Sequence, residues 1–283
     1  MTAIQAAILG IVQGLTEFFP ISSSGHLILV PWAFGWHFFL TNPDLNKTFD
    51  VALHVGTFVA ILAFMWRDVV RLLAAFFGSV WRRRIKTPDE KLAWLLLVST
   101  IPAGIVGVAF EGFIEKQLGK PYLIAILMIV FGAVMWAVDS RFPLKKKLDS
   151  LHWPQALLIG VAQALALAPG VSRSGVTLTA LRGLKMDRTS AVRYSFLLTL
   201  PVIGGSALYK SLQVVRHGGL PAGTGTPFLI GIATAAVAGF FAAWFLFRYL
   251  RSHSLRAFVW YRFALGAAVL IVIAVGLRGA TGI

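Results

Sequence analysis

Residues 13–27 read QGLTEFFPISSSGHL, and they place a glutamate, three adjacent serines and a histidine inside an apolar N-terminal region. A carboxylate at membrane depth costs about 3 kcal/mol of insertion free energy, so it calls for a partner or a function. Pro20 interrupts a helix because it lacks an N–H and clashes with the preceding turn. The stretch therefore predicts a helix, a turn at 22–25 and a second helix that starts near Ser23 or Ser24.

The composition of the whole chain is that of a polytopic α-helical membrane protein. Of the 283 residues, 58% are hydrophobic and 13% are charged, with a mean hydropathy of +0.79, whereas soluble domains carry about 25% charged residues. Several charge-free runs approach the ~20 residues that span a bilayer, and they lack the alternation of a transmembrane β-barrel. We predict six spans, at 48–66, 92–110, 121–138, 194–214, 227–247 and 260–278.

The net charge of +15 is unevenly distributed along the chain. Nineteen of the 26 lysines and arginines lie in four segments, 67–91, 139–150, 182–193 and 248–262. The positive-inside rule places these four segments in the cytoplasm. Contact of such loops with anionic lipid head groups explains the charge better than nucleic-acid binding does, so membrane lipids are the expected partners and nucleic acid is not.

Two further segments, 1–31 and 153–182, are interrupted near their middle by Pro, Gly and Ser. The positive charges on both sides of 153–182 place both of its ends in the cytoplasm. Because three spans separate the two segments, both ends of 1–31 are then expected to lie outside. Both are therefore predicted to be re-entrant helix–turn–helix segments. Irregular backbone at membrane depth is tolerated only where protein or a water-filled cavity surrounds it.

The two interrupted segments also match each other at an offset of 150 residues. The identical pairs are Gly10 and Gly160, Gln13 and Gln163, Leu15 and Leu165, Ser22 and Ser172, Ser24 and Ser174, and Gly25 and Gly175. We interpret 1–150 and 151–283 as two repeats within a single integral membrane domain. Each repeat has one re-entrant segment and three spans, and this odd number inverts the second repeat relative to the first. The predicted fold is an all-α polytopic membrane protein with an inverted-topology repeat.

The residues able to carry chemistry in the first repeat cluster at its turn. Gln13 and Glu17 are spaced i, i+4 and so share one helix face. The serines at 22–24 and Gly25 surround a helix start, whose exposed N–H groups and positive dipole end favour an anion. His26 follows in the first turn of that helix. Serine caps and a buried histidine would each explain part of the pattern, but their combination with a carboxylate favours a ligand site.

The corresponding stretch of the second repeat is PGVSRSGVT at 169–177. The planar guanidinium of Arg173 suits bidentate contact with phosphate oxygens. Ser172, Ser174 and Thr177 offer hydroxyls, and the N–H groups around Gly175 complete an anion-binding nest.

Glu17 and Arg173 are expected to be the only acidic and basic side chains at membrane depth, with a purely structural ion pair as the alternative. Two opposed helix starts with these charges predict a site for a phosphorylated ligand that has a lipid tail.

The first motif resembles the (E/Q)-x-x-x-E and P-x-S-S-(S/T)-G-H signature of bacterial undecaprenyl-diphosphate phosphatases of the bacitracin-resistance type. PGVSRSGVT, KTFDVALHVGT at 47–57 and YRF at 261–263 are also similar to segments of that family, in the same order. The resemblance implies hydrolysis of undecaprenyl diphosphate to the monophosphate, which recycles the carrier lipid of peptidoglycan synthesis and confers bacitracin resistance. It also implies a divalent cation, Mg²⁺ or Ca²⁺, and a bacterial plasma-membrane location with the site facing the periplasmic or outer side.

The same resemblance implies roles for individual residues. Glu17 is the essential carboxylate and, with Gln13, a cation ligand, although Gln13 brings no charge to that site. Ser23 is the candidate nucleophile with His26 beside it, and Arg173 binds phosphate. The flanking residues Ser22, Ser24, Gly25, Ser172, Ser174, Gly175 and Thr177 complete the expected substrate-binding set. A phosphoserine intermediate and direct attack by water both stay open, as does assembly into a homodimer.

A second function class is a transporter or flippase for a phosphorylated lipid, because inverted repeats with broken helices also build transporters. The Glu–Ser–His cluster favours hydrolysis, since a carrier needs no nucleophile or base. A structural scaffold would not explain a buried Glu and Arg. Asp50 and His54 either line the outer mouth of the site or pair with a neighbour, and the pairing is the favoured interpretation.

Overall fold

The computed structural model describes residues 1–36, 43–216 and 223–280, and within these ranges the chain is helical, with one isolated bridge between Lys146 and Met186. Six helices are long and apolar enough to cross a membrane, namely Leu45–Phe64, Pro88–Phe110, Pro121–Arg141, Arg188–Tyr209, Gly225–Tyr249 and Arg256–Ala274. Each predicted span coincides with one of these helices, with boundaries that differ by a few residues. The prediction of an all-α polytopic membrane protein is confirmed.

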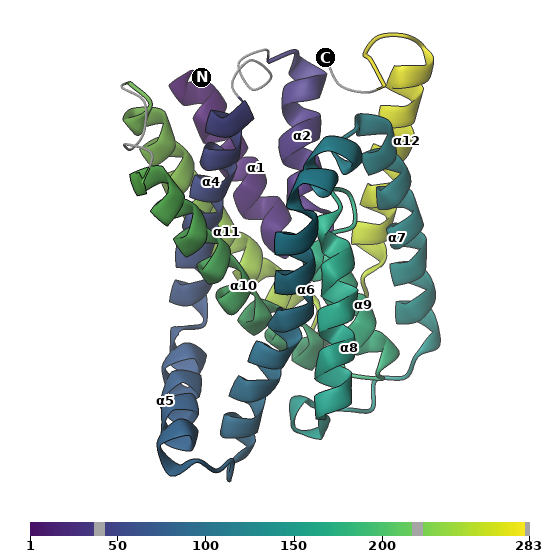
Figure 1. The fold of residues 1–283 in the computed structure, drawn as a ribbon. Helices are drawn as coiled ribbons and strands as arrows, with labels where there is room; N and C mark the ends of the chain where they lie inside the picture. Colours follow the sequence, from purple (N-terminus) through teal and green to yellow (C-terminus); the bar gives the residue numbers. More distant parts are fainter. Residues whose placement is uncertain (37–42, 217–222, 281–283) are drawn as a thin grey trace.

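The helices follow one another along the chain as drawn in Figure 1. The first part contains α1 (Ala3–Phe18), α2 (Ser23–Phe34), α4 (Pro43–Phe64), α5 (Trp66–Arg82), α6 (Pro88–Leu118) and α7 (Pro121–Arg141). The second part contains η1 (Leu148–Ser150), α8 (Trp153–Ala164), η2 (Leu165–Leu167), α9 (Arg173–Gly183), α10 (Arg188–Arg216), α11 (Gly225–Tyr249) and α12 (Arg256–Ala274).

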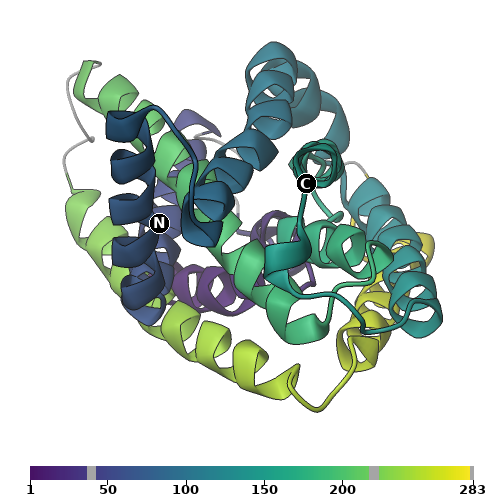
Figure 2. The same ribbon diagram turned by 90° about the horizontal axis from the view of Figure 1, so that it is seen from below.

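Two pairs of short helices occupy the middle of the molecule. In Figure 1, α1 starts at the end where the N-terminus lies and reaches the centre, and α2 returns to the same end. The pair α8 and α9 approaches from the opposite end. Seen from below, these short helices lie toward the centre, with longer helices around them (Figure 2). The turns of both pairs therefore meet near the centre, while their depth in the bilayer stays a prediction.

Each short pair is packed against a long helix from the other half of the chain through backbone contact. A Cβ atom on Gly14 of α1 would lie only 2.6 Å from the backbone N of Gly239 on α11. In the same way, a Cβ on Gly160 of α8 would lie 2.7 Å from the carbonyl O of Ser99 on α6. Such close approach through small residues is the usual way in which membrane helices associate. It fixes α1 and α8 laterally and so fixes the turns that follow them.

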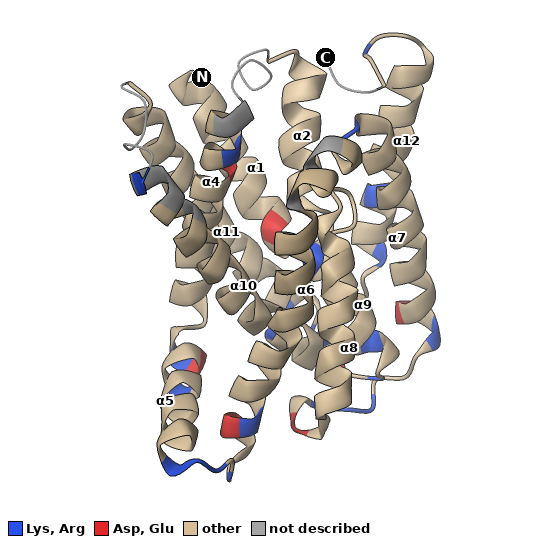
Figure 3. Cartoon of the chain, in the orientation of Figure 1, with Lys and Arg blue, Asp and Glu red and all other residues tan. Residues whose placement is uncertain are grey.

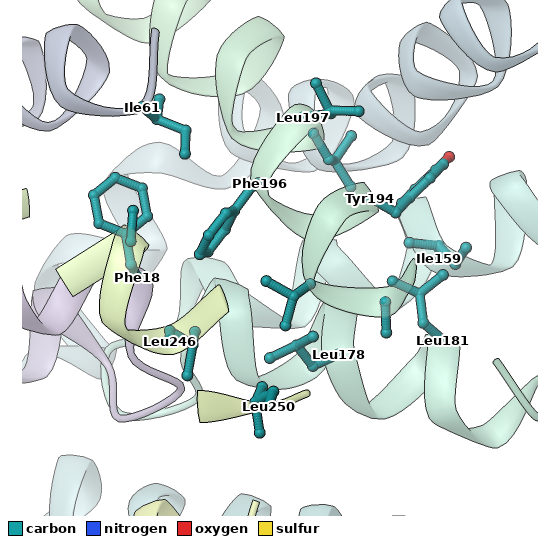
Figure 4. Packing of buried hydrophobic residues seen from close by; sticks show 14 of the residues in the cluster. Phe18, Ile61, Ile159, Leu178, Leu181, Tyr194, Phe196, Leu197, Leu246 and Leu250 are labelled. Atoms are coloured by element: carbon teal, nitrogen blue, oxygen red, sulfur yellow. The ribbon is translucent and has the colours of Figure 1, made fainter. Parts of the chain in front are cut away.

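The largest cluster of buried apolar side chains includes residues of α1, α4, α8, α9, α10 and α11, part of which Figure 4 shows. Phe18, the last residue of α1, packs edge to face on Phe196 of α10 with ring centroids 5.4 Å apart. Large apolar side chains also cover the outer surface of the long helices, for example Val59, Val130 and Phe241. An exposed apolar surface of this extent is that of a protein that faces lipid.

The basic segment 67–91 is mostly helix, which the charge count alone does not indicate. Within α5, the exposed side chains of Val70, Leu73 and Phe77 recur at the three- and four-residue spacing of one helix face. The charged side chains of Arg82 and Asp68 lie on the same helix as this apolar face, so α5 is amphipathic. It is not among the helices that are apolar enough to cross a membrane. Lys and Arg gather at this end of the molecule and at the connection between α7 and α8 (Figure 3).

Because the chain contains no cysteine, single introduced cysteines will report the predicted orientation. In spheroplasts, a membrane-impermeant maleimide is expected to label Gln117→Cys, near the C-terminal end of α6, but to label Lys86→Cys, in the basic segment 67–91, only after permeabilisation. Both positions are exposed in the structure. Labelling of Lys86→Cys in intact spheroplasts would show that the orientation in the membrane is opposite to the predicted one.

Candidate active site

The two central turns have the same unusual backbone geometry. Ser22 and Ser172 adopt φ angles of 76° and 77°, which are rare for residues other than glycine. Each serine caps the helix that follows: Ser22 Oγ accepts a hydrogen bond from Gly25 N (3.4 Å) and Ser172 Oγ accepts one from Gly175 N (3.1 Å). A strained backbone of this kind costs about 1–3 kcal/mol and persists where the surroundings enforce it. Helices α2 and α9 therefore start at matched, strained turns.

Hydrogen bonds tie the two turns directly to each other. The backbone N–H of Gly170 donates to Ser22 Oγ (2.9 Å), and the hydroxyl of Ser174 donates to the carbonyl of Phe19 (3.0 Å). These bonds join segments about 150 positions apart in the sequence, and they bring the two helix starts into one site.

The side chains at the centre of the site converge on one carboxylate. Glu17 Oε1 accepts a hydrogen bond from Arg173 Nη2 at 2.9 Å, which forms an ion pair between the two repeats. Glu17 Oε2 accepts from the hydroxyl of Ser23 at 2.6 Å and from Gln13 Nε2 at 2.9 Å. The Glu17 side chain is only 4% exposed. The structure thus brings together Gln13, Glu17, Ser23 and Arg173, as the sequence predicts.

Two buried atoms of this cluster lack a hydrogen-bond partner among the residues that the structure describes. They are Arg173 Nη1, a donor, and Gln13 Oε1, an acceptor. Leaving such an atom buried and unpaired costs about 1–3 kcal/mol, and in native proteins it often marks a place for a ligand. The donor suits an anionic oxygen, and the acceptor suits a cation or a ligand donor.

Most of the other predicted substrate-binding hydroxyls are already bonded within the protein. Ser172 Oγ lies 3.3 Å from Ser174 Oγ, and Thr177 Oγ1 bonds the carbonyl of Arg173 (2.8 Å) and Ser195 Oγ (2.8 Å). These groups hold the shape of the second turn. Ser24 remains half-buried at the start of α2, where the first N–H groups of the helix have no intrahelical acceptor.

The two turn glycines let the halves pack closely. A Cβ on Gly25 would lie 3.1 Å from Ile124 Cγ2 and 3.3 Å from Gly170 N, and a Cβ on Gly175 would lie 3.0 Å from Ser172 Cβ. A larger residue at Gly25 would press on the second turn at Gly170, and one at Gly175 would press on Ser172 within its own turn.

His26 is placed differently from the sequence-based expectation. Its Nδ1 lies 2.7 Å from the carbonyl of Ser22, and since a carbonyl can only accept, Nδ1 carries a proton. In the neutral ring Nε2 is then an acceptor, and it lies 2.8 Å from the Tyr261 hydroxyl, which donates. Both ring nitrogens are engaged in these two bonds, and neither bond goes to Ser23. The ring supports the first turn from the side of α12.

His54, by contrast, belongs to the site. Its Nε2 lies 3.5 Å from Glu17 Oε2, and its Nδ1 lies 2.7 Å from the backbone carbonyl of Asp50. His54 therefore does pair with a neighbour, as the favoured interpretation has it, but that neighbour is the central carboxylate of the site. The i, i+4 spacing of Asp50 and His54 is visible in the sequence, but the contact depends on how α4 packs against α1.

Glu17 and Arg173 are not the only buried charged side chains, and whether the others also lie at membrane depth stays a prediction. Arg182 and Arg262 are each 1% exposed and Asp139 is 6% exposed. Arg182 pairs with Asp139 across α9 and α7 at 2.9 Å. Arg262 falls inside the predicted span 260–278, and an arginine within a span was the available signal for a buried functional group.

Comparison with known proteins agrees with this site. The family model described as bacitracin resistance protein BacA matches residues 6–268. The chain belongs to this family. A relative from Pelobacter propionicus, named undecaprenyl-diphosphatase, is 42% identical over 280 residues, which cover 99% of this chain and all of the relative.

Two further relatives with the same name come from Geotalea daltonii and Geobacter sulfurreducens. Each is 44% identical; the alignments cover 98% and 95% of this chain, and 100% and 98% of the respective relative. The match to the bacitracin-resistance family therefore extends over nearly the full length, and it includes both turn motifs.

Since Glu17 competes for Arg173, removing its charge should favour an anion at the site. In purified protein with a chelator, Glu17→Gln is expected to bind inorganic pyrophosphate about tenfold more tightly than wild type, because a repelling charge at close range is lost. The measurement is the pyrophosphate concentration needed to raise Tm. Thr16→Val, on the neighbouring position of α1, serves as the control and should match wild type. Equal or weaker binding by Glu17→Gln would contradict the assignment of Arg173 as the anion ligand.

Proposed function

We propose that this protein hydrolyses undecaprenyl diphosphate to undecaprenyl phosphate and inorganic phosphate, and so returns the carrier lipid to peptidoglycan synthesis. Family membership and full-length relatives named undecaprenyl-diphosphatase support this function. The observation that carries the chemistry is the Ser23 hydroxyl, 2.6 Å from a buried carboxylate that is itself paired with Arg173.

In the covalent route, Ser23 Oγ attacks the terminal phosphorus while Glu17 Oε2 takes the hydroxyl proton. The new bond is Oγ–P, the bond to the bridging oxygen breaks, and undecaprenyl phosphate leaves. Water then hydrolyses the phosphoserine and releases inorganic phosphate. In the direct route, Glu17 and Ser23 orient a water molecule that attacks the same phosphorus. The hydrogen bond between Ser23 and Glu17 serves both routes.

Arg173 stabilises the phosphoryl group in either route. Its Nη2 holds Glu17 in place, while its unpaired Nη1 is a donor for a phosphoryl oxygen. The N–H groups at the starts of α2 and α9 add further positive potential. Groups fixed in advance around the developing charge are the main source of catalysis in phosphoryl transfer.

His26 has a supporting role in this scheme. Because its ring nitrogens bond Ser22 O and the Tyr261 hydroxyl, Glu17 is the group placed to accept the proton of Ser23. His26 instead holds the carbonyl next to the nucleophile and so fixes the backbone of the first turn.

The residues at the site fit a divalent cation, Mg²⁺ or Ca²⁺. Such ions take carboxylate and amide oxygens, which Glu17 and Gln13 supply, and Gln13 Oε1 is buried without a partner. Within the described ranges no three His, Cys, Asp or Glu side chains are grouped for metal binding, so water and diphosphate oxygens would complete the ligand set. A bound cation would neutralise part of the diphosphate charge.

The substrate's tail calls for a membrane setting. Six apolar helices make this a multi-pass membrane protein, and we place it in the bacterial plasma membrane with the site open to the outer side. The polyprenyl chain stays in lipid while the diphosphate reaches the turns. A flippase using the same anion site is less well supported, because transport alone does not require a serine bonded to a buried carboxylate.

Substitution of the central residues should abolish hydrolysis. Ser23→Ala, Glu17→Gln and Arg173→Lys are each expected to lower phosphate release from a polyprenyl diphosphate by about 10²–10⁴-fold. Thr16→Val is the matched control, since Thr16 bonds only the carbonyl of Val12 within α1, and its rate should stay near that of wild type. Unchanged release by Glu17→Gln would refute the site.

Trapping labelled phosphate distinguishes the two routes. The covalent route predicts label on Ser23 after rapid quenching with a substrate labelled at its terminal phosphate. If no labelled adduct forms on the wild-type protein, and oxygen from labelled water appears in the phosphate released in a single turnover, water attacks the phosphorus directly.

The cation assignment is testable without turnover. Calorimetric binding of Mg²⁺ or Ca²⁺ to the chelator-treated protein is expected to weaken in Gln13→Leu, because Gln13 supplies a neutral oxygen ligand. Retention of full affinity in that variant would remove Gln13 from the ligand set.

A further inference from the structure

Arg262 of α12 is a fully buried side chain whose guanidinium contacts both central turns. Only 1% of the residue is exposed. All of its hydrogen bonds go to backbone carbonyls: those of Met128 (3.0 Å), Pro20 (3.2 Å), Val171 (3.0 Å), Gly170 (2.8 Å) and Leu127 (3.4 Å). One side chain thus joins the first turn, the second turn and α7.

These carbonyls lie immediately before the reacting groups. Pro20 is three residues before Ser23, and Val171 is two residues before Arg173. The Nη1 atom bonds both carbonyls at once, at 3.2 Å and 3.0 Å. A change in the position of this atom would therefore change the spacing between nucleophile and phosphate ligand. The planar fork of arginine can reach carbonyls in several directions, which the single ammonium of lysine cannot do.

The charge of Arg262 has no acidic partner among the residues that the structure describes; no carboxylate lies within 4.0 Å of its side-chain nitrogens. Burying a charge on carbonyl dipoles alone is costly, because no opposite charge compensates for its lost hydration. Arg182 offers a contrast within the same chain, because it is equally buried but pairs with Asp139. The cost at Arg262 therefore points to a geometric requirement at the site.

The preceding residue reinforces the first turn. The Tyr261 hydroxyl donates to His26 Nε2, and His26 Nδ1 donates to the carbonyl of Ser22. Two consecutive residues of α12 thus hold the backbone on both sides of Ile21, while Arg262 alone also reaches the second turn.

We propose that Arg262 is a positioning residue of the phosphatase reaction, which fixes the alignment of the Glu17–Ser23 pair relative to Arg173. This inference rests on the proposed function. A misplacement of about 1 Å between reacting groups can cost about 10²-fold in rate. Ground-state binding of the diphosphate depends less on that alignment, so the effect should fall on kcat rather than on KM.

The test compares Arg262→Lys and Arg262→Met with wild type and with Arg182→Lys. For each purified protein Tm is measured first, and kcat and KM for a polyprenyl diphosphate are then measured well below the lowest Tm. Arg262→Lys and Arg262→Met are expected to lose about 10²-fold in kcat with little change in KM. Arg182→Lys, which disturbs a buried arginine far along α9, is expected to lower Tm with kcat retained.

Three results would overturn the proposal. The first is an Arg262→Lys protein that folds and keeps its kcat. The second is an equal loss of kcat in Arg182→Lys, which would make the effect one of general destabilisation. The third is failure of both Arg262 variants to fold while Arg182→Lys folds, which would make Arg262 a folding determinant only. Wild-type phosphate release tests the proposed function separately, because the role of Arg262 is measured relative to it.

Discussion

The ion pair between Glu17 and Arg173 is the interaction on which the rest of the structure depends. The two residues lie on opposite turns and 156 positions apart, and their 2.9 Å contact requires both turns to reach the same point. Burying either charge without the other is costly, so the pairing favours the observed meeting of the halves. The strained serines, the packed glycines and the buried Arg262 all serve this meeting. In the proposed mechanism, catalysis uses two atoms that do not take part in this contact: Nη1 of Arg173, and Oε2 of Glu17, which accepts the hydrogen bond of Ser23.

Much of this arrangement can be predicted from the sequence because it follows from local rules. Runs without charge give the six spans, and Pro20 with the adjacent serines gives the turn and the start of α2. The six identities at a fixed offset indicate that residues near 172 form a matching turn, and Ser22 and Ser172 indeed share one backbone conformation. The convergence of Gln13, Glu17, Ser23 and Arg173 follows from these rules together with the rarity of buried charges.

The rest depends on lateral packing, which periodicity does not specify. His54 contacts the site because α4 lies beside α1. The spacing of residues within α4 does not predict which helix packs against it. His26 lies three residues after Ser23 in sequence, but its ring is held by Tyr261, which comes from α12. The value of Arg262 is likewise visible only once five carbonyls from three segments surround it. Helix α5 has an apolar face, and a count of the charges in its basic segment does not predict that face.

The packing of α1 on α11 has a consequence for how the protein is made. The glycine face of α1 fits a helix that begins at Gly225, and Glu17 has no arginine partner until residue 173 has been synthesised. The chain is synthesised from its N-terminus at about 5–20 residues per second. Glu17 therefore lacks its arginine partner during more than half of translation. The N-terminal pair therefore reaches its final packing only after the partner residues in the second half of the chain have been synthesised.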